Sequence, residues 1–327
     1  MIYPKHLSDG SKIGVVALSA GVGNQLEDYK KSIKSLENHS FHIIETASVR
    51  STLEASNTAE VRAKELDRLV TDPDVDMIMC ATGGDFLIEI LPYVNYSHIQ
   101  EFPKWFMGAS DPTSLLFYIT TALDIATMYG HNAGSYDASI LHESQKISID
   151  MIKGNIREQN SYPLYESNRK NRVDGYALDQ KVIWETLNGD VNLTGRMIGG
   201  CIDCLRDMIG TRFDEVKSFI YRYQEDGIIW YFDIFSLSSE DFYRTLLQMR
   251  EAGWFQFIKG VVVGRVMFPS TFTTMTYQKA LTTVFPNIPV IFNADIGHVV
   301  PKMTIINGSI AHIEAHDGDG KISLEEV

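Results

Sequence analysis

The first half of the chain alternates short apolar runs with amphipathic segments of helical length, and this alternation restricts the possible folds more than any other feature. Residues 12–19, 76–81 and 104–108 have the length and composition of buried strands. Residues 26–38 and 59–70 carry apolar side chains at helical spacing. Strands and helices in this order form right-handed β-α-β units, so we predict a parallel sheet covered by helices on both faces.

The remaining segments complete a two-domain α/β chain. The first half also contains a predicted strand at 41–45 and helices at 86–94 and 113–123, whereas 143–175 is polar and typical of an interdomain connection. The second half has a predicted helix at 179–187, two more at 240–252 and 272–285, and strands at 227–233, 260–267, 289–293, 304–306, 311–315 and 321–324. We predict domains at 1–145 and 178–327 with a connection at 146–177.

Charge excludes two classes of partner. The sequence has 29 basic and 42 acidic residues, for a formal net charge of −13, which disfavours nucleic acid and anionic membrane surfaces. The densest basic run, residues 169–172, is interpreted as a solvated loop. The sequence shows neither a secretory signal nor a membrane-length apolar stretch, so we expect a cytoplasmic protein.

The three cysteines fit that compartment, because an odd number gives no disulfide framework. Cys201 and Cys204 form a C-x-x-C, for which zinc would need two further ligands at similar spacing, and the sequence offers none. A redox pair would normally lie just after a strand, at a helix start. The periodic apolar residues around the pair favour small, buried helix residues instead, and we expect neither metal nor cofactor.

A serine stands where a predicted strand turns into a helix. In MGASDPT, Asp111 is a candidate cap and Pro112 suits the first helical position. Ser110 is then exposed at the positive end of the helix dipole, beside backbone N–H groups suited to a developing oxyanion. A simple helix cap is the alternative, because G-x-S-x-P lacks the second glycine of the usual hydrolase turn.

Three other strand ends carry unusual residues. Gly83 and Gly84 follow a strand, where glycine lets a backbone amide approach a substrate, although a plain tight turn explains them equally well. Asp233 ends the apolar run GIIWYFD, and a buried carboxylate there needs a partner such as a histidine. His298 follows a strand in NADIGHVVP. Serine, acid and histidine at strand ends are together more specific than any one of them.

The C-terminal DGDGKISLEE superficially resembles a calcium loop. Aligning Gly320 with the invariant glycine puts Ala315 at the first carboxylate position, so calcium is disfavoured. Asp-Gly between alternating runs predicts a hairpin turn instead.

Several motifs together resemble the serine peptidase family of murein LD-carboxypeptidases and microcin C immunity proteins. They are GASDPT (108–113), TGG (82–84), GRMIGG (195–200), KGVVVGR (259–265) and DIGHVVPKM (295–303), in order along nearly the whole chain. The resemblance implies a flavodoxin-like N-terminal domain bearing the nucleophile and a β-rich, barrel-like C-terminal domain bearing the acid and histidine. It also implies a homodimer.

The resemblance assigns a role to each candidate residue. Ser110 becomes the nucleophile, His298 the general base and Asp233 the acid, with the backbone amides of Gly84 and Asp111 as the oxyanion hole. The family usually has glutamate at the acid position, and aspartate is one methylene shorter. Ala109, Asp85 and Phe86 also depart from the family pattern and bear on the choice of substrate.

The implied activity is acyl transfer to Ser110, with a small peptide or a peptidyl nucleotide as the substrate. The first expectation is an LD-carboxypeptidase that releases a terminal D-amino acid from a murein tetrapeptide. The alternative is a microcin C-type immunity hydrolase that cleaves the carboxamide of a peptidyl or aminoacyl nucleotide. A catalytically weak binding module on the same scaffold stays open. An α/β-hydrolase shares the Ser, Asp, His order but requires G-x-S-x-G.

Overall fold

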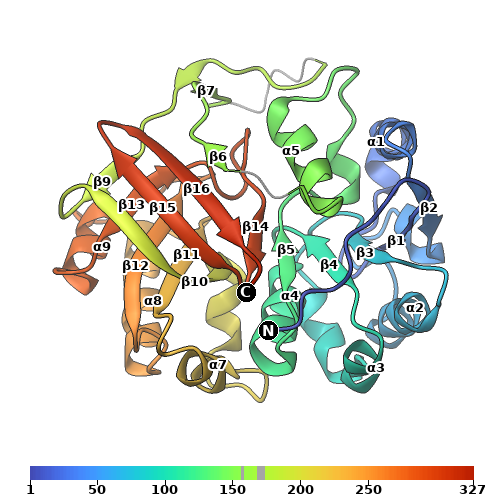
Figure 1. Ribbon diagram of the computed structural model, residues 1–327, viewed down its shortest axis with the longest axis horizontal. Coiled ribbons are helices and arrows are strands. Elements are labelled where there is room, and N and C mark those ends of the chain that lie inside the picture. Colours follow the sequence, from blue (N-terminus) through green and yellow to red (C-terminus); the bar gives the residue numbers. More distant parts are fainter. Residues whose placement is uncertain (156–157, 168–173) are drawn as a thin grey trace. The chain divides into compact units, whose positions relative to one another are not determined.

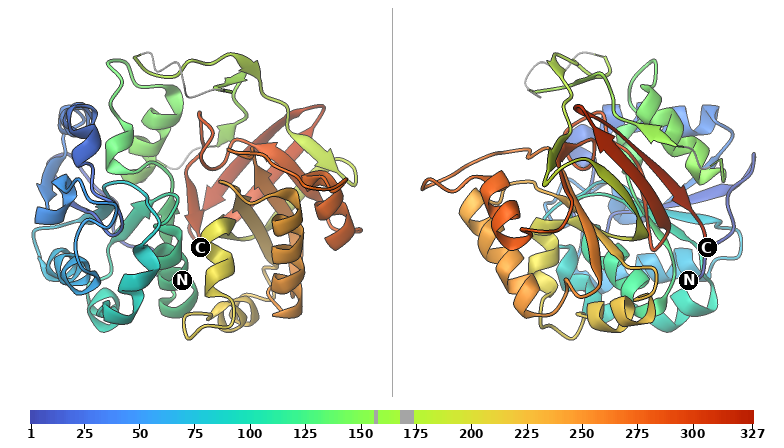
Figure 2. Two further views of the ribbon diagram at one scale, coloured as in Figure 1. Left: turned by 180° about the vertical axis from the view of Figure 1, so that it is seen from behind. Right: turned by 60° about the vertical axis from the view of Figure 1, so that its left-hand side comes forward.

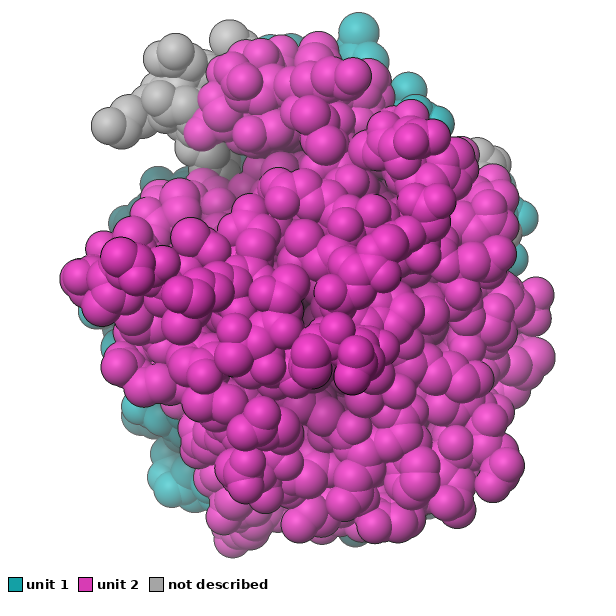
Figure 3. Space-filling view, turned by 90° about the vertical axis from the view of Figure 1, so that its left-hand side faces the viewer, with its two compact units in different colours: residues 1–155, 172–175 teal, residues 156–171, 176–327 magenta. Residues whose placement is uncertain are grey.

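The computed structural model describes residues 1–155, 158–167 and 174–327, and the chain divides into two compact units (Figure 3). Unit 1 comprises residues 1–155 with a short segment that ends at Gly175, and unit 2 comprises the rest. The predicted solvated loop at 169–172 lies outside the described residues.

Unit 1 is built on a parallel sheet with the spatial order β2-β1-β3-β4-β5 (Figure 1). Its strands are β1 (Lys12–Val16), β2 (His42–Glu45), β3 (Met77–Cys80), β4 (Trp105–Gly108) and β5 (Thr127–Tyr129). All the pairings between them are parallel. This is the flavodoxin-like order, in which the chain reverses direction across the sheet between β1 and β3. The predicted fold class is confirmed.

Helices cover both faces of this sheet. In the two views of Figures 1 and 2, α1 and α5 lie on one side and α2, α3 and α4 on the other. Their bounds are α1 (Leu26–Asn38), α2 (Ala59–Thr71), α3 (Tyr96–Glu101), α4 (Thr113–Leu123) and α5 (Glu143–Ile152). Helix α2 begins where the Thr58 hydroxyl accepts the Val61 N–H at 3.4 Å, so Thr58 is its N-cap.

Unit 1 differs from the sequence prediction in several places. Residues 86–94 form a 3₁₀ helix, η3 (Leu87–Tyr93), and Pro92 within it has no N–H for an α-helical bond. Helix α5 occupies part of the predicted irregular connection. It begins with a capping box made by His142 and Gln145, and histidine is not a usual cap residue. Strand β5 was not predicted because it has only three residues.

Unit 2 contains an eight-stranded mixed sheet in the order β6-β16-β15-β10-β11-β12-β13-β9. Its strands are β6 (Gln159–Asn160), β9 (Glu185–Leu187), β10 (Val191–Cys201), β11 (Ile228–Asp233), β12 (Ile258–Gly264), β13 (Val290–Ala294), β15 (Ile310–His316) and β16 (Asp319–Glu325). The central strands β10 to β13 are parallel, so their carboxyl ends share one edge. The outer pairings are antiparallel.

Unit 2 also contains strands outside this sheet and helices. They are β7 (Leu164–Tyr165), β8 (Gln180–Lys181), β14 (Ile305–Asn307), α6 (Ile202–Leu205), α7 (Val216–Arg222), α8 (Ser239–Glu251) and α9 (Tyr277–Val284). Ser238 caps α8 by accepting the Asp241 N–H at 3.1 Å. Helix α9 is shorter than the predicted 272–285 and begins at its own cap, Thr276. Within the described residues, the model contains no helix that could cross a bilayer.

The predicted helix at 179–187 is wrong. The segment forms strands β8 and β9, and between them Val182 and Trp184 are buried whereas Ile183 is exposed. Burial at every second residue is the period of a strand. The predicted C-terminal hairpin is confirmed, since Asp317 (φ 52°) and Gly318 (φ 90°) form the turn between β15 and β16.

One buried cation fixes the loops that follow β1 and β3. Arg62 on α2 has no exposed surface. Its Nη1 donates to the carbonyls of Leu18 at 2.7 Å and Phe86 at 2.9 Å, and its Nη2 pairs with Glu89 at 2.7 Å. Leu18 follows β1 and Phe86 follows β3, so this side chain ties together two loops at the carboxyl edge of the sheet.

Replacing Arg62 by leucine is expected to destabilise the chain. The Arg62→Leu variant leaves two carbonyls buried without a donor, and we expect a loss of about 2–4 kcal/mol in the free energy of unfolding. Urea denaturation measures it. Arg68→Leu, at an exposed position of the same helix, is the matched control and should change stability by less than about 0.5 kcal/mol. Equal losses would contradict this account.

Candidate functional site

Ser110 occupies a strained turn between β4 and α4. Its φ is 71°, a left-handed conformation that costs a residue with a side chain about 1–3 kcal/mol. The backbone holds it there, because the Ser110 N–H donates to the Tyr129 hydroxyl at 3.2 Å and the Ser110 carbonyl accepts the Thr113 N–H at 2.9 Å. Despite the missing second glycine, the turn has the strained strand-to-helix geometry that exposes nucleophilic serines.

The two glycines after β3 lie against this serine. A Cβ on Gly83 would stand 3.0 Å from Ser110 Oγ, and a Cβ on Gly84 would stand 2.3 Å from Ser19 Oγ. The Gly83 carbonyl accepts the Ala20 N–H at 3.2 Å. Because a trans peptide directs its carbonyl and its N–H to opposite sides, the Gly84 N–H points away from Ala20. The close approach requires glycine at both positions.

The prediction that Asp111 caps α4 is wrong. The helix begins after Pro112 without a side-chain cap. Asp111 is buried, and its Oδ2 accepts the Leu87 N–H at 2.8 Å, so its carboxylate fixes the loop after β3. Burial raises the pKa of Asp111, and hydrogen bonds from the Ser19 hydroxyl and the Leu87 N–H oppose that rise. The side chain therefore connects the serine turn to the glycine loop.

Asp233 and His298 meet at the carboxyl edge of the sheet in unit 2. Asp233, the last residue of β11, has no exposed surface, and His298 lies in the loop after β13 with 12% of its side chain exposed. Asp233 Oδ2 is 2.7 Å from His298 Nδ1, and Asp233 Oδ1 accepts the His298 backbone N–H at 3.2 Å. One carboxylate thus holds both the ring and the backbone of the histidine. Aspartate is one methylene shorter than the glutamate of the family pattern, but Asp233 still contacts His298.

Gly297 makes this contact possible. Its φ is +105°, and a Cβ there would stand 2.1 Å from Asp233 Oδ1. Only glycine at position 297 lets the backbone come this close to Asp233, because the carboxylate occupies the place of a Cβ. On the other side of the histidine, the ring of Phe235 packs against the His298 ring at a centroid distance of 4.6 Å.

Asp203 is a structural residue that the sequence analysis missed. Its Oδ2 accepts the Phe235 N–H at 3.0 Å, and its Oδ1 accepts the N–H groups of Ser236 at 2.9 Å and Leu237 at 3.1 Å. These bonds shape the turn that directly follows Asp233. An aspartate two residues beyond a strand end is the only sequence signal for this role.

Cys201 and Cys204 do not lie together within one helix, contrary to the prediction. Cys201 is the last residue of β10, in register with Asp233 on β11, and Cys204 lies in α6 directly after it. The glycine-rich sequence before Cys201 conceals the strand, because glycine has low strand propensity. A sulfur of Cys201, a carboxylate oxygen of Asp233 and a ring nitrogen of His298 all lie within 4.8 Å of one another.

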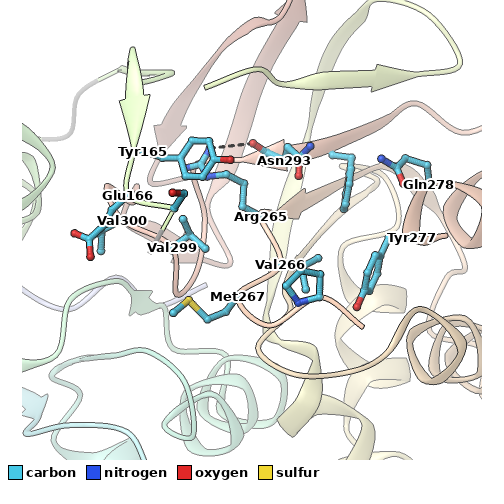
Figure 4. Close-up of a pocket in the computed structure, with 13 residues that line it drawn as sticks. Tyr165, Glu166, Arg265, Val266, Met267, Tyr277, Gln278, Asn293, Val299 and Val300 are labelled. Carbon is cyan, nitrogen blue, oxygen red and sulfur yellow. Dashed lines mark hydrogen bonds between the residues drawn. The ribbon is translucent and has the colours of Figure 1, made fainter. Parts of the chain in front are cut away.

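A pocket of about 360 Å³ lies beside the histidine loop in unit 2 (Figure 4). Val299 and Val300, which follow His298, form part of its lining. Arg265 also lines it, and its guanidinium pairs with the buried Asp295 and stacks on the ring of Tyr165. The aromatic side chains of the lining are Tyr165, Tyr277 and Phe292.

The predicted site residues divide between the two units. Unit 1 carries Ser110, Gly84 and Asp111, with the glycine loop packed against the serine. Unit 2 carries Asp233 and His298 and brings them into contact. Each group lies at the carboxyl ends of parallel strands, where α/β sheets bind ligands.

This combination of an α/β fold with a serine turn and an acid–histidine pair is typical of serine hydrolases. Comparison with known proteins agrees. Residues 13–130 match the model of the LD-carboxypeptidase N-terminal domain, and residues 194–313 match that of the C-terminal domain. The chain belongs to the LD-carboxypeptidase family of serine peptidases. It is a serine-type carboxypeptidase or amide hydrolase.

The relatives include carboxypeptidase-like proteins and a microcin self-immunity protein. A carboxypeptidase-like protein of Vibrio cholerae is 26% identical, over 93% of this chain and 92% of its own length. The microcin self-immunity protein MccF of Escherichia coli is 26% identical over 76% and 74%. The crystal structure of an MccF-like protein from Bacillus anthracis has a TM-score of 0.85 at 21% identity, and the match covers 100% of both chains.

Substituting Gly297 is expected to disable the acid–histidine pair. In Gly297→Ala the new methyl group displaces the Asp233 carboxylate, and a displacement of about 1 Å costs about 100-fold in rate. The measurement is kcat/KM for amide hydrolysis. Gly253→Ala, also at a glycine with positive φ (+83°) in unit 2, is the control for backbone strain and should lose stability only. Full activity in Gly297→Ala would refute the role of this contact.

Proposed function

We propose that the chain hydrolyses an amide bond by acyl transfer, with Ser110 as nucleophile, His298 as general base and Asp233 as the acid that orients the histidine. The 2.7 Å contact between Asp233 Oδ2 and His298 Nδ1 carries this proposal. A carboxylate on Nδ1 holds the proton there and leaves Nε2 to accept the serine proton. The strained Ser110 turn supports it, because such turns present the hydroxyl to a substrate.

The reaction proceeds in two steps. Ser110 Oγ attacks the amide carbonyl while His298 takes its proton, and His298 then gives that proton to the leaving amine. Water hydrolyses the resulting acyl-enzyme with the same histidine as base. In this proposal the backbone N–H groups of Gly84 and Asp111 stabilise the oxyanion. Both residues lie in turns next to the serine and outside the helices, so their N–H groups are not committed to helical hydrogen bonds.

The favoured substrate is a murein tetrapeptide, from which the enzyme releases the terminal D-amino acid. The matches to LD-carboxypeptidase domains over both halves of the chain support this choice. In this proposal, the glycine loop and the rim residues Asp85 and Phe86 contact the peptide next to the scissile bond.

A second candidate is the carboxamide of an aminoacyl or peptidyl nucleotide. Structures of MccF exist in complex with aspartyl sulfamoyl adenosine, and an MccF-like protein from Streptococcus pneumoniae has been solved with AMP. The pocket of Figure 4 favours this candidate, because aromatic side chains line it, Tyr165 and Tyr277 among them, and aromatic rings pack well against a planar base. The charge of Arg265 in that pocket is balanced by Asp295, which suits a base better than a free carboxylate.

Ser110→Ala is expected to abolish hydrolysis while the chain stays folded. Loss of the nucleophile should lower kcat by at least about 10³-fold, since activities of this kind depend on the nucleophile and base acting together. Labelling by a fluorophosphonate provides an independent readout, and the native chain should react at Ser110. Ser139→Ala, in a loop of unit 1, is the control. A native chain that neither reacts nor turns over amides would instead be a binding module.

The two substrate classes can be separated by one comparison. We expect kcat/KM for an L-Lys-D-Ala bond in a murein tetrapeptide to exceed that for an aminoacyl sulfamoyl adenosine. Tyr165→Ala, which removes an aromatic ring of the pocket, should then leave the murein rate within about threefold. The reverse preference, with a tenfold or larger loss for the nucleotide in Tyr165→Ala, would establish the second candidate instead.

A further inference from the structure

The thiol of Cys201 lies beside the acid–histidine pair, a position that the hydrolytic mechanism does not use. Cys201 ends β10 and is directly across from Asp233 on β11. Its sulfur, an Asp233 oxygen and a His298 nitrogen lie within 4.8 Å of one another. These three donors come from three separate segments of unit 2, which is why no sequence spacing revealed them.

Cys204, partly buried and three residues after Cys201, is the candidate for a fourth donor. It follows Cys201 by one turn in α6, and a hydrogen bond between the two thiols is the largest cause of the raised pKa of Cys201, ahead of burial and the charges of Asp233 and Asp203. Two cysteines separated by two residues at a strand-to-helix turn form the usual half of a zinc site. Asp233 and His298 complete the set of four that the sequence spacing alone could not supply.

We propose that Cys201, Cys204, Asp233 and His298 form a site for a thiophilic divalent cation, Zn²⁺, which overlaps the acid–histidine pair. Sulfur and imidazole donors select Zn²⁺ over Mg²⁺ or Ca²⁺, which prefer oxygen. A tetrahedral Zn²⁺ holds its ligand atoms about 3.3–3.8 Å apart. The donor atoms of Cys201, Asp233 and His298 need to contract by about 1 Å from their 4.8 Å spread to reach that geometry.

Binding at this site blocks hydrolysis. The cation takes the place of the proton that Asp233 and His298 share, and the cysteine thiols release their protons to solvent as they become ligands. His298 is then a metal ligand and no longer a base for the serine. The 12% exposed edge of the His298 side chain provides the way in, because Asp233 and Cys201 are buried. Only this inhibitory consequence rests on the proposed function.

Metal binding is tested without reference to activity. Calorimetry of Zn²⁺ into the full chain, kept reduced by a phosphine, should give one ion per chain, and Co²⁺ should give a thiolate charge-transfer band. Cys201→Ser should weaken binding at least tenfold and remove much of that band. Cys80→Ala, which changes the buried cysteine of unit 1, should bind like the native chain. Absence of binding, or unchanged binding in Cys201→Ser, overturns the proposal.

Two further variants protect this test against misfolding and against failure of the proposed function. Cys204 is only partly buried, so Cys204→Ser carries the same expectation if Cys201→Ser does not fold. Ser110→Ala should bind Co²⁺ as the native chain does. Zn²⁺ should inhibit amide hydrolysis reversibly, with activity restored by EDTA and each rate normalised to the metal-free rate of that variant. Cobalt binding without metal-free hydrolysis would refute the hydrolase, and hydrolysis without binding would refute the site.

Discussion

The burial of one carboxylate determines much of the structure of unit 2. Asp233 has no exposed surface, and an ionised carboxylate without partners is too costly to bury. Its two oxygens are therefore both engaged, one by the ring of His298 and the other by its backbone N–H. To allow this, the chain has glycine at position 297 and a turn after Asp233 that Asp203 holds in place. The need to pair the Asp233 carboxylate thus constrains the loop at 297–298, the turn after Asp233 and the segment of Asp203.

Unit 1 satisfies a similar requirement by different means. Its charged interior groups, Arg62 and Asp111, bind backbone atoms of the loops after β1 and β3 rather than side chains of a reaction centre. Hydrogen bonds from charged groups to backbone are stronger than neutral ones. They hold the glycine loop against Ser110, whose strained backbone needs surroundings that fix it. Loop position is therefore set by side chains that would not themselves touch a substrate.

The sequence predicted the elements whose signals are local. The bounds of α1 and α4 follow from periodicity, and the C-terminal hairpin follows from Asp-Gly. Strand β10 was missed because its glycines give no strand signal, although it lies at the centre of its sheet. The acid and the histidine were recognisable as residues at strand ends, but their contact depends on parallel pairing of distant segments. The neighbourhood of Cys201 depends on the same pairing, so spacing along the chain could not reveal it.

The contact between Gly297 and Asp233 means that positions 233 and 297 cannot vary independently. Because Asp233 Oδ1 fills the volume that a Cβ at 297 would take, the length of the side chain at 233 and the residue at 297 are one packing choice, not two. Substitutions at the two positions should be strongly non-additive, as for any residues that share a volume. In a relative, a residue other than glycine at 297 would require the acid at 233 to contact its histidine from a different direction.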